Sequence, residues 1–67
     1  MKTTEPPVEG IVIEALPSLQ FKVQLAGGRT VRCFLSGKMK MNHIRVLAGD
    51  RVRLIVSGDI GRIERRL

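Results

Sequence analysis

The segment SGKMKMNHIRVLAGD, residues 36–50, separates two stretches of the chain in which apolar and polar residues alternate. TVRCFLS leads into the segment and DRVRLIV begins at its last residue. Alternation with a period of two is typical of β-strands with one buried face. The segment itself holds three cations, Lys38, Lys40 and Arg45, together with two methionines and the only histidine of the chain. The pattern therefore predicts a cationic insert between two strands.

Five segments have the residue types of short β-strands. AGGR, at residues 26–29, predicts a hairpin turn between the second and third of them, because glycine readily adopts the positive φ of tight turns. Gly10 predicts a bulge or a bend in the first. The five segments are VEGIVIEALP (residues 8–17), FKVQL (21–25), TVRCFLS (30–36), DRVRLIV (50–56) and RIERRL (62–67).

The alternation also assigns an inner face to each strand. In the last strand it places Ile63 and Arg65 inward. Phe34 falls on the outward side of the third strand, beside Thr30 and Arg32, where a polar residue is usual. The other predicted inward residues are Phe21, Val23, Leu25, Val31, Cys33, Leu35, Val52, Leu54 and Val56.

The insert itself has helical spacing. Ser36 is a plausible N-cap and Gly49 a plausible end, so we expect one to two turns held in place by packing. The spacing predicts two faces, one polar and one apolar. Their members are Lys38, Asn42 and Arg45, and Met41, Ile44 and Leu47, respectively.

The chain has 67 residues, enough for one domain. We expect a flexible N-terminal tail at residues 1–7 and an all-β domain at residues 8–67. Five short strands with one short helix between the third and fourth match the five-stranded Greek-key barrel called the OB-fold. An SH3-like barrel is the alternative, although it usually lacks a helix at this position.

The charge balance favours an anionic partner. Twelve Lys and Arg against six Asp and Glu leave a net charge of +6, which suits a nucleic acid or an acidic membrane surface. One cysteine and one histidine are too few for a disulfide or a metal site. No catalytic group stands out, and no apolar run resembles a signal peptide or a membrane span. We therefore expect a cytoplasmic binding protein without a cofactor or enzymatic activity.

Arginine is the main cation of the predicted strands and recurs at outward positions of the last three, so barrel closure would gather several on one wall. Arginine suits bidentate contacts to phosphate. With two Phe, no Tyr and no Trp, the chain lacks the row of aromatics on which single strands stack. The sequence therefore favours folded RNA, read by shape and phosphates. Arg32 is one candidate contact. Phe34 is another, as a base-stacking side chain, and is equally compatible with packing under a loop.

Three parts of the chain carry a family resemblance. SGKMKMNHIRVLAGDRV closely resembles the signature of bacterial translation initiation factor one, EGIVIEALPSLQFKVQL is similar to the opening strands of that family, and GRIERR is similar to its closing strand. Together they lie within residues 9–66. The turn SGDIG is shorter than the corresponding turn of the family, and Phe34 stands where relatives often have a polar residue or histidine.

The resemblance implies an OB-fold protein that binds the small ribosomal subunit at its decoding site during initiation. Such factors bury the insert in the minor groove of a ribosomal RNA helix, displace two adenines, occlude the site and cooperate with the other two initiation factors. By matching position, the implied RNA contacts are Lys38, Met39, Lys40, Asn42 and Arg45 of the insert, and Arg62 and Arg66 of the last strand.

Two other functions fit the same fold. One is a general RNA or single-stranded DNA chaperone of cold-shock or S1 type, which would need a stacking platform. The other is a protein-interaction module whose charge is incidental. A monomer is expected in each case.

Overall fold

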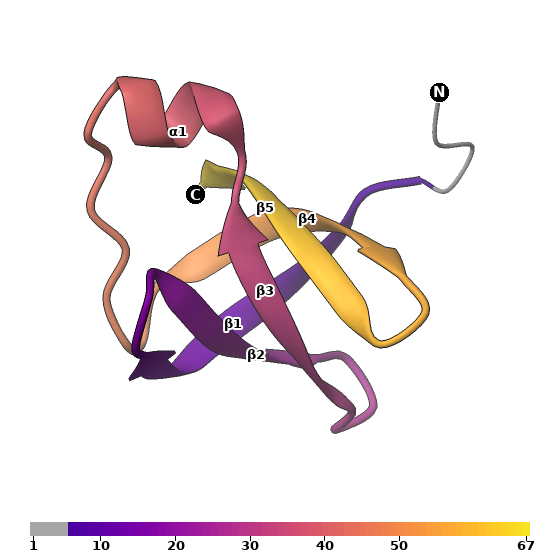
Figure 1. The fold of residues 1–67 in the computed structure, drawn as a ribbon. Helices are drawn as coiled ribbons and strands as arrows, with labels where there is room; N and C mark the ends of the chain where they lie inside the picture. The colour runs from indigo at the N-terminus through magenta and orange to yellow at the C-terminus, as the bar shows by residue number, and fades with distance from the viewer. Residues whose placement is uncertain (1–5) are drawn as a thin grey trace.

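The computed structural model describes residues 6–67, which form a closed barrel of five strands with one short helix (Figure 1). Of the predicted tail, residues 1–5 lie outside the described part, and residues 6–7 run into the first strand without regular structure. The elements are β1 (Val8–Leu16), β2 (Gln20–Leu25), β3 (Thr30–Leu35), α1 (Gly37–Met41), β4 (Arg51–Ser57) and β5 (Ile60–Arg66).

The strands follow the order β1-β2-β3-β5-β4 around the barrel, and β4 closes the ring by pairing with β1. All neighbours are antiparallel except β3 and β5, which are parallel. The next strand along the chain, β4, is not a neighbour of β3 but lies beyond β5, so the chain leaves β3 through α1 and passes over one end of the barrel to reach it (Figure 1). The predicted all-β OB-fold, with its helix between the third and fourth strands, is confirmed.

The barrel interior is filled by the inward residues of all five strands. The predicted inner positions of β2, β3 and β4 are confirmed, with Leu25 and Val56 packed against the core rather than fully inside it. Two residues of the insert, Met39 and Val46, complete the interior. The buried core comprises Val12, Phe21, Val23, Val31, Cys33, Leu35, Met39, Val46, Val52, Leu54 and Ile63.

Gly10 is a point of close strand approach. It pairs with Leu25 on one side and with Val52 on the other. An added Cβ would lie 2.5 Å from Cγ1 of Val23 and 2.9 Å from the carbonyl oxygen of Gln24. The predicted bulge is not at this residue, because the register of β1 shifts between Val12 and Glu14 instead. Glycine is needed at position 10 for space.

The alternation of β5 breaks near its end. Leu54 pairs with Ile63 but Arg53 pairs with Arg65, so Glu64 is an extra residue in the ladder. A bulge of this kind turns the following side chains to the opposite face. Arg65 is therefore exposed, and the prediction that it points inward is wrong.

The helix of the insert is shorter than its spacing suggested. Ser36 is the N-cap, as predicted, and its Oγ accepts a hydrogen bond from the amide of Met39 at 3.3 Å. The helix ends at Met41, because Asn42 is the C-cap and His43 has a φ of +53°. Gly49 is therefore not the end of the helix.

Of the apolar face predicted for the insert, only Ile44 packs against the core. Met41 is 80% exposed and Leu47 is 53% exposed, whereas Met39 is 2% exposed and holds the helix against the barrel. Once the helix stops at Met41, residues 44–47 lose helical spacing, and Val46 becomes the buried residue instead of Leu47.

The far end of the insert is attached to β1 where the strand shifts register. The amide of Gly49 donates a hydrogen bond to the carbonyl oxygen of Val12 at 2.6 Å, and the amide of Val12 donates one to the carbonyl oxygen of Asp50 at 2.9 Å. The Asp50 carboxylate also accepts from the amide of Leu47 at 2.8 Å. Both ends of the insert are thus held by the barrel, which restricts its motion.

Replacing Gly10 with alanine should lower the free energy of unfolding by about 1–3 kcal/mol, the usual cost of forcing extra volume into packed structure. Gly37→Ala is the matched control, because an added Cβ there has nothing within 4 Å. Urea unfolding followed by circular dichroism measures both variants. Equal stabilities of the two would contradict the close approach at position 10.

Candidate nucleic-acid interface

The insert displays a set of exposed polar side chains over one end of the barrel. Lys38, Lys40, Asn42 and Arg45 are all exposed. Met39 is the exception among the predicted contacts of the insert. The N-capped turn directs its side chain into the core, so Met39 is a packing residue and its predicted role as an RNA contact is wrong.

One side of the insert faces the end of β5 across a depression of about 630 Å³, which we call the cationic groove. Lys38 and Asn42 line it from the insert, and Arg66 lines it from β5. Arg53 and Arg65 were not among the predicted contacts. The lining residues are Lys38, Met39, Asn42, Ile44, Arg53, Glu64, Arg65 and Arg66.

The other side of the insert faces the β1–β2 turn. Lys40, His43 and Arg45 line a second hollow there, which has an apolar floor that includes Phe21 and Leu35. The predicted single face of Lys38, Asn42 and Arg45 is therefore wrong, because the left-handed turn at His43 sends Arg45 to the opposite side. The consequence is that the insert presents cations on two sides.

Arg66 joins the end of β5 to the insert. Its Nη1 donates a hydrogen bond to the carbonyl oxygen of Arg45 at 2.9 Å, while the side chain stays exposed. This contact ties the unwound part of the insert to the barrel. Arg66 thus combines two properties, since it positions the insert and adds a positive charge to the cationic groove.

Ion pairs divide the cations of the barrel into two groups. Glu9 lies within 4 Å of Arg51 and Arg53, and Glu64 lies 2.5 Å from Nε of Arg62. Lys22 and Arg29 also have carboxylate partners. Within residues 6–67, no carboxylate lies within 4.0 Å of the cations at the insert, at the end of β5 or at the middle of β3. These cations are Arg32, Lys38, Lys40, Arg45, Arg65 and Arg66.

The free cations are concentrated where the insert meets β5. Exposed ion pairs contribute little to stability, but they neutralise charge, so the unpaired cations dominate the local potential. The strand order places β5 between β3 and β4. The arginines of the last three strands therefore share a wall, as predicted, and the insert extends that wall beyond the barrel.

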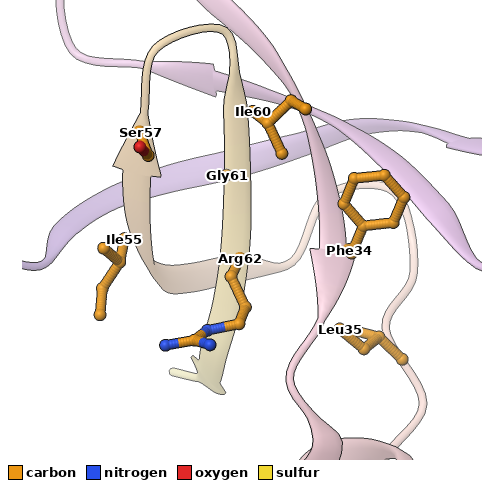
Figure 2. Close-up of a pocket in the computed structure, with 7 residues that line it drawn as sticks. All are labelled: Phe34, Leu35, Ile55, Ser57, Ile60, Gly61 and Arg62. Carbon is orange, nitrogen blue, oxygen red and sulfur yellow. The ribbon is translucent and has the colours of Figure 1, made fainter. Parts of the chain in front are cut away.

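A second depression lies lower on the same wall, and Figure 2 shows its lining side chains. We call it the apolar groove; its volume is about 400 Å³. Phe34 is half-buried and faces outward as predicted, directly across the β3–β5 ladder from Arg62. The apolar residues Ile55 and Ile60 were not predicted site residues. The lining residues are Phe34, Leu35, Ile55, Ser57, Ile60, Gly61 and Arg62.

The side chains with reactive or metal-binding groups are dispersed. Cys33 lies in the core, and burial raises the pKa of its thiol to about 11, partly offset by a hydrogen bond from the backbone of Gly61. His43 is exposed in the insert. Among residues 6–67 there is no group of three or more His, Cys, Asp or Glu placed to hold a metal ion. Cys33 is a packing residue.

No helix in the described part of the chain is long and apolar enough to cross a membrane.

Sequence reasoning missed several residues of the two grooves for different reasons. Arg53 was assigned to the outer face of its strand, and only the adjacency of β4 and β5 brings it to the groove. Arg65 was missed because of the bulge at Glu64, since alternation alone places the Arg65 side chain inside the barrel. Ile55 carried a signal that was available, because alternation places this apolar residue outward, whereas Ile60 fell in the predicted turn SGDIG and begins β5 only in the structure.

The barrel order and the cationic insert between β3 and β4 define a small OB-fold domain, and solved structures of this shape are known. No protein-family model matches the chain. The chain is similar to the solution structure of translation initiation factor one from the Wolbachia endosymbiont strain TRS of Brugia malayi. The TM-score is 0.78 and the identity is 39%, over 92% of this chain and 77% of that one.

Two larger proteins contain a domain of the same shape. The crystal structure of YjeQ from Thermotoga maritima matches with a TM-score of 0.79 and 28% identity, covering 92% of this chain and 23% of that one. YloQ, a circularly permuted GTPase, matches with a TM-score of 0.81 and 23% identity, covering 100% of this chain and 25% of that one. At 23% identity, the match to YloQ shows a shared fold and nothing more.

The identity and coverage of the first match settle the family. The chain belongs to the translation initiation factor one family. The resemblance found in the insert and the flanking strands is thereby confirmed.

The burial of Cys33 predicts a pH dependence of stability. The pKa of the folded-state thiol is about 11, against an ordinary value of 9.0, so the unfolded chain loses its proton first as the pH rises. The protonated thiol therefore contributes fully to the free energy of unfolding below pH 9. This contribution should be lost progressively between pH 9 and pH 11, by at most about 3 kcal/mol. Urea unfolding across this range, compared with Cys33→Ala, isolates the effect. Parallel pH curves for the two proteins would refute it.

Proposed function

We propose that this protein is a translation initiation factor that binds the small ribosomal subunit at its decoding site by inserting residues 36–50 into a groove of ribosomal RNA. Membership of the initiation factor one family supports the role in initiation. The observation that carries the proposal is the group of unpaired cations where the insert meets β5. Such charges favour phosphates, and binding releases the counterions condensed on RNA.

The shape of the insert suits a groove with phosphates on both walls. Lys38 and Asn42 face one side, and Lys40 and Arg45 face the other. The minor groove of an RNA helix is wide and shallow and is recognised through its shape, phosphates and 2′-hydroxyls. A narrow projection with cations on two sides can contact both walls at once.

Rigidity of the insert supports tight binding. The N-cap at Ser36, the buried Met39 and the bond from Arg66 to the Arg45 carbonyl hold the insert in one conformation before contact. Preorganisation lowers the entropy lost on binding. Met39 therefore acts through packing, and the proposed contacts are Lys38, Lys40, Asn42, Arg45, Arg62, Arg66, Arg32 and Phe34.

The proposed action is occupation of a site, without catalysis or a cofactor. A bound factor would block the decoding site during initiation and cooperate there with the other initiation factors. It would act as a monomer in the cytoplasm. An RNA chaperone of cold-shock or S1 type remains the rival function, and it differs in preferring unstructured strands.

Arg45→Ala should weaken binding to purified small subunits by about 10- to 100-fold, which corresponds to the loss of one charge-assisted hydrogen bond. Lys22→Ala is the control, since it also removes one positive charge, at an exposed residue of β2 that is paired with Glu14 and is not a proposed contact. Cosedimentation measures both, and an aminoglycoside that occupies the decoding site should compete with the wild-type protein. Equal binding by the two variants, or no competition, would contradict the proposed site.

Binding should depend steeply on salt. If about six phosphates are neutralised, the logarithm of the binding constant should fall with the logarithm of salt concentration with a slope of about −5. Arg45→Ala should reduce that slope by about one. A slope near zero would refute phosphate binding. Affinity for unstructured oligonucleotides equal to that for small subunits would favour the chaperone instead.

A further inference from the structure

The hollow between the insert and the β1–β2 turn, with a volume of about 380 Å³, is bordered by strained backbone. Within residues 6–67, three residues other than glycine have a positive φ, namely Ser18, Leu19 and His43. Leu19 lines the hollow from the turn, and His43 lines it from the insert. A positive φ is costly for a residue with a Cβ, and such residues cluster at functional sites. Backbone strain is therefore concentrated around this one hollow.

His43 is fixed in place by the turn that ends α1. Its amide donates a hydrogen bond to the carbonyl oxygen of Lys40 at 3.2 Å, and the amide of Ile44 donates one to the carbonyl oxygen of Met39 at 3.1 Å. These two bonds form a Schellman motif, whose left-handed position is usually glycine and sometimes asparagine. His43 occupies that position with a φ of +53°. The turn alone therefore does not account for a histidine.

The imidazole of His43 is exposed beside two cations. Lys40 and Arg45 line the same hollow and are the only other residues of its lining that carry a charge or titrate. The remaining lining residues, from the β1–β2 turn, β2, β3 and the insert, are all apolar. Within residues 6–67, no carboxylate lies within 4.0 Å of the imidazole, and no side-chain hydrogen bond engages it. A proton on His43 therefore adds a third unpaired positive charge to this side of the insert.

We propose that His43 contacts an RNA phosphate through its protonated imidazole, so that binding of the insert to RNA takes up a proton. This inference rests on the proposed RNA-binding function and adds a dependence on pH to it. Imidazole is the side chain that ordinarily titrates between pH 5 and pH 8. When protonated, it donates hydrogen bonds from both ring nitrogens, and a phosphate within reach favours the charged form. The proton comes from the solvent, and no covalent bond of the RNA changes.

The position of His43 favours a phosphate over a base as its partner. Asn42 lines the cationic groove and Arg45 lines the hollow, so the insert passes from one side to the other at His43. An insert that enters a groove with phosphates on both walls therefore brings His43 to the wall that Lys40 and Arg45 face. A base acceptor would bind the N–H of a neutral imidazole, whereas a phosphate binds the charged form more strongly.

Two variants separate the charge of His43 from its part in the turn. Asparagine tolerates the left-handed position, so His43→Asn keeps the turn but cannot gain a proton. His43→Lys carries a positive charge at every pH of the assay. Circular dichroism confirms that both variants are folded, and urea unfolding confirms that their stabilities are comparable at pH 8.

Affinity is measured at pH 6, pH 7 and pH 8 and at constant ionic strength, by cosedimentation with small subunits and by fluorescence anisotropy with a labelled RNA hairpin. The wild-type affinity should rise by about 5- to 10-fold from pH 8 to pH 6, since one charge-assisted hydrogen bond forms over the titration range of imidazole. His43→Asn should bind like the wild type at pH 8 and change by less than about twofold. His43→Lys should bind tightly throughout.

Two further readouts identify the group that takes up the proton and its partner. Calorimetry at pH 7 in buffers of different ionisation enthalpy should find that the wild-type protein takes up about half a proton or more on binding, and that His43→Asn takes up almost none. The dependence of affinity on salt should be steeper at pH 6 than at pH 8 by up to about one unit of slope for the wild type, as expected for one more phosphate. An unchanged slope would overturn the phosphate contact.

The outcomes distinguish this inference from the proposed function. If the wild-type protein binds subunits equally well at pH 6 and pH 8, the protonated contact is refuted and the function stands. If the hairpin binds with a pH dependence that His43→Asn abolishes but subunits do not bind, the contact stands and the function is refuted. An equal pH dependence of the wild type and His43→Asn would place the titrating group elsewhere. A large loss of affinity in His43→Asn at pH 8 would show that the neutral imidazole is the contact, and either result overturns the inference.

Discussion

Closure of a small barrel depends on strands that approach one another more closely than a side chain allows. Gly10 and Gly61 supply the two tight points, since an added Cβ would meet Val23 in the first case and the sulfur of Cys33 at 2.8 Å in the second. Gly10 lies where β1 pairs with both β2 and β4, so the ring closes through it. With the ring closed, the barrel exposes no free strand edge, and its two ends and outer wall are available for function.

The closed barrel also determines where charge accumulates. Acidic residues lie beside the arginines of the β2–β3 turn and β4 and beside Arg62 of β5, whereas the insert and the end of β5 carry cations without carboxylate partners in residues 6–67. Lysine and arginine side chains without carboxylate neighbours keep their full attraction for phosphate. The unpaired positive charge is therefore concentrated at the insert and the end of β5, and hydrogen bonds to the barrel hold the insert in place.

The two grooves of the wall differ in chemistry although they share β5. One is cationic and is completed by the insert; the other is apolar and left open by a short turn. This arrangement suits a partner that offers phosphates at one place and an apolar face nearby.

Alternation, capping and the insert motif are local signals, and they were enough to predict the strand count, the inner faces of β2, β3 and β4, the N-cap at Ser36 and the family. Four features became visible only in the folded barrel: the position of the β1 bulge, the outward turn of Arg65, the burial of Met39 and the separation of Arg45 from Lys38. Each of these depends on a contact between residues far apart in the chain. A register shift is set by the neighbouring strand, and the path of the insert after α1 follows the left-handed turn at His43 and the burial of Val46 in the barrel. The periodicity of the sequence therefore cannot predict these features.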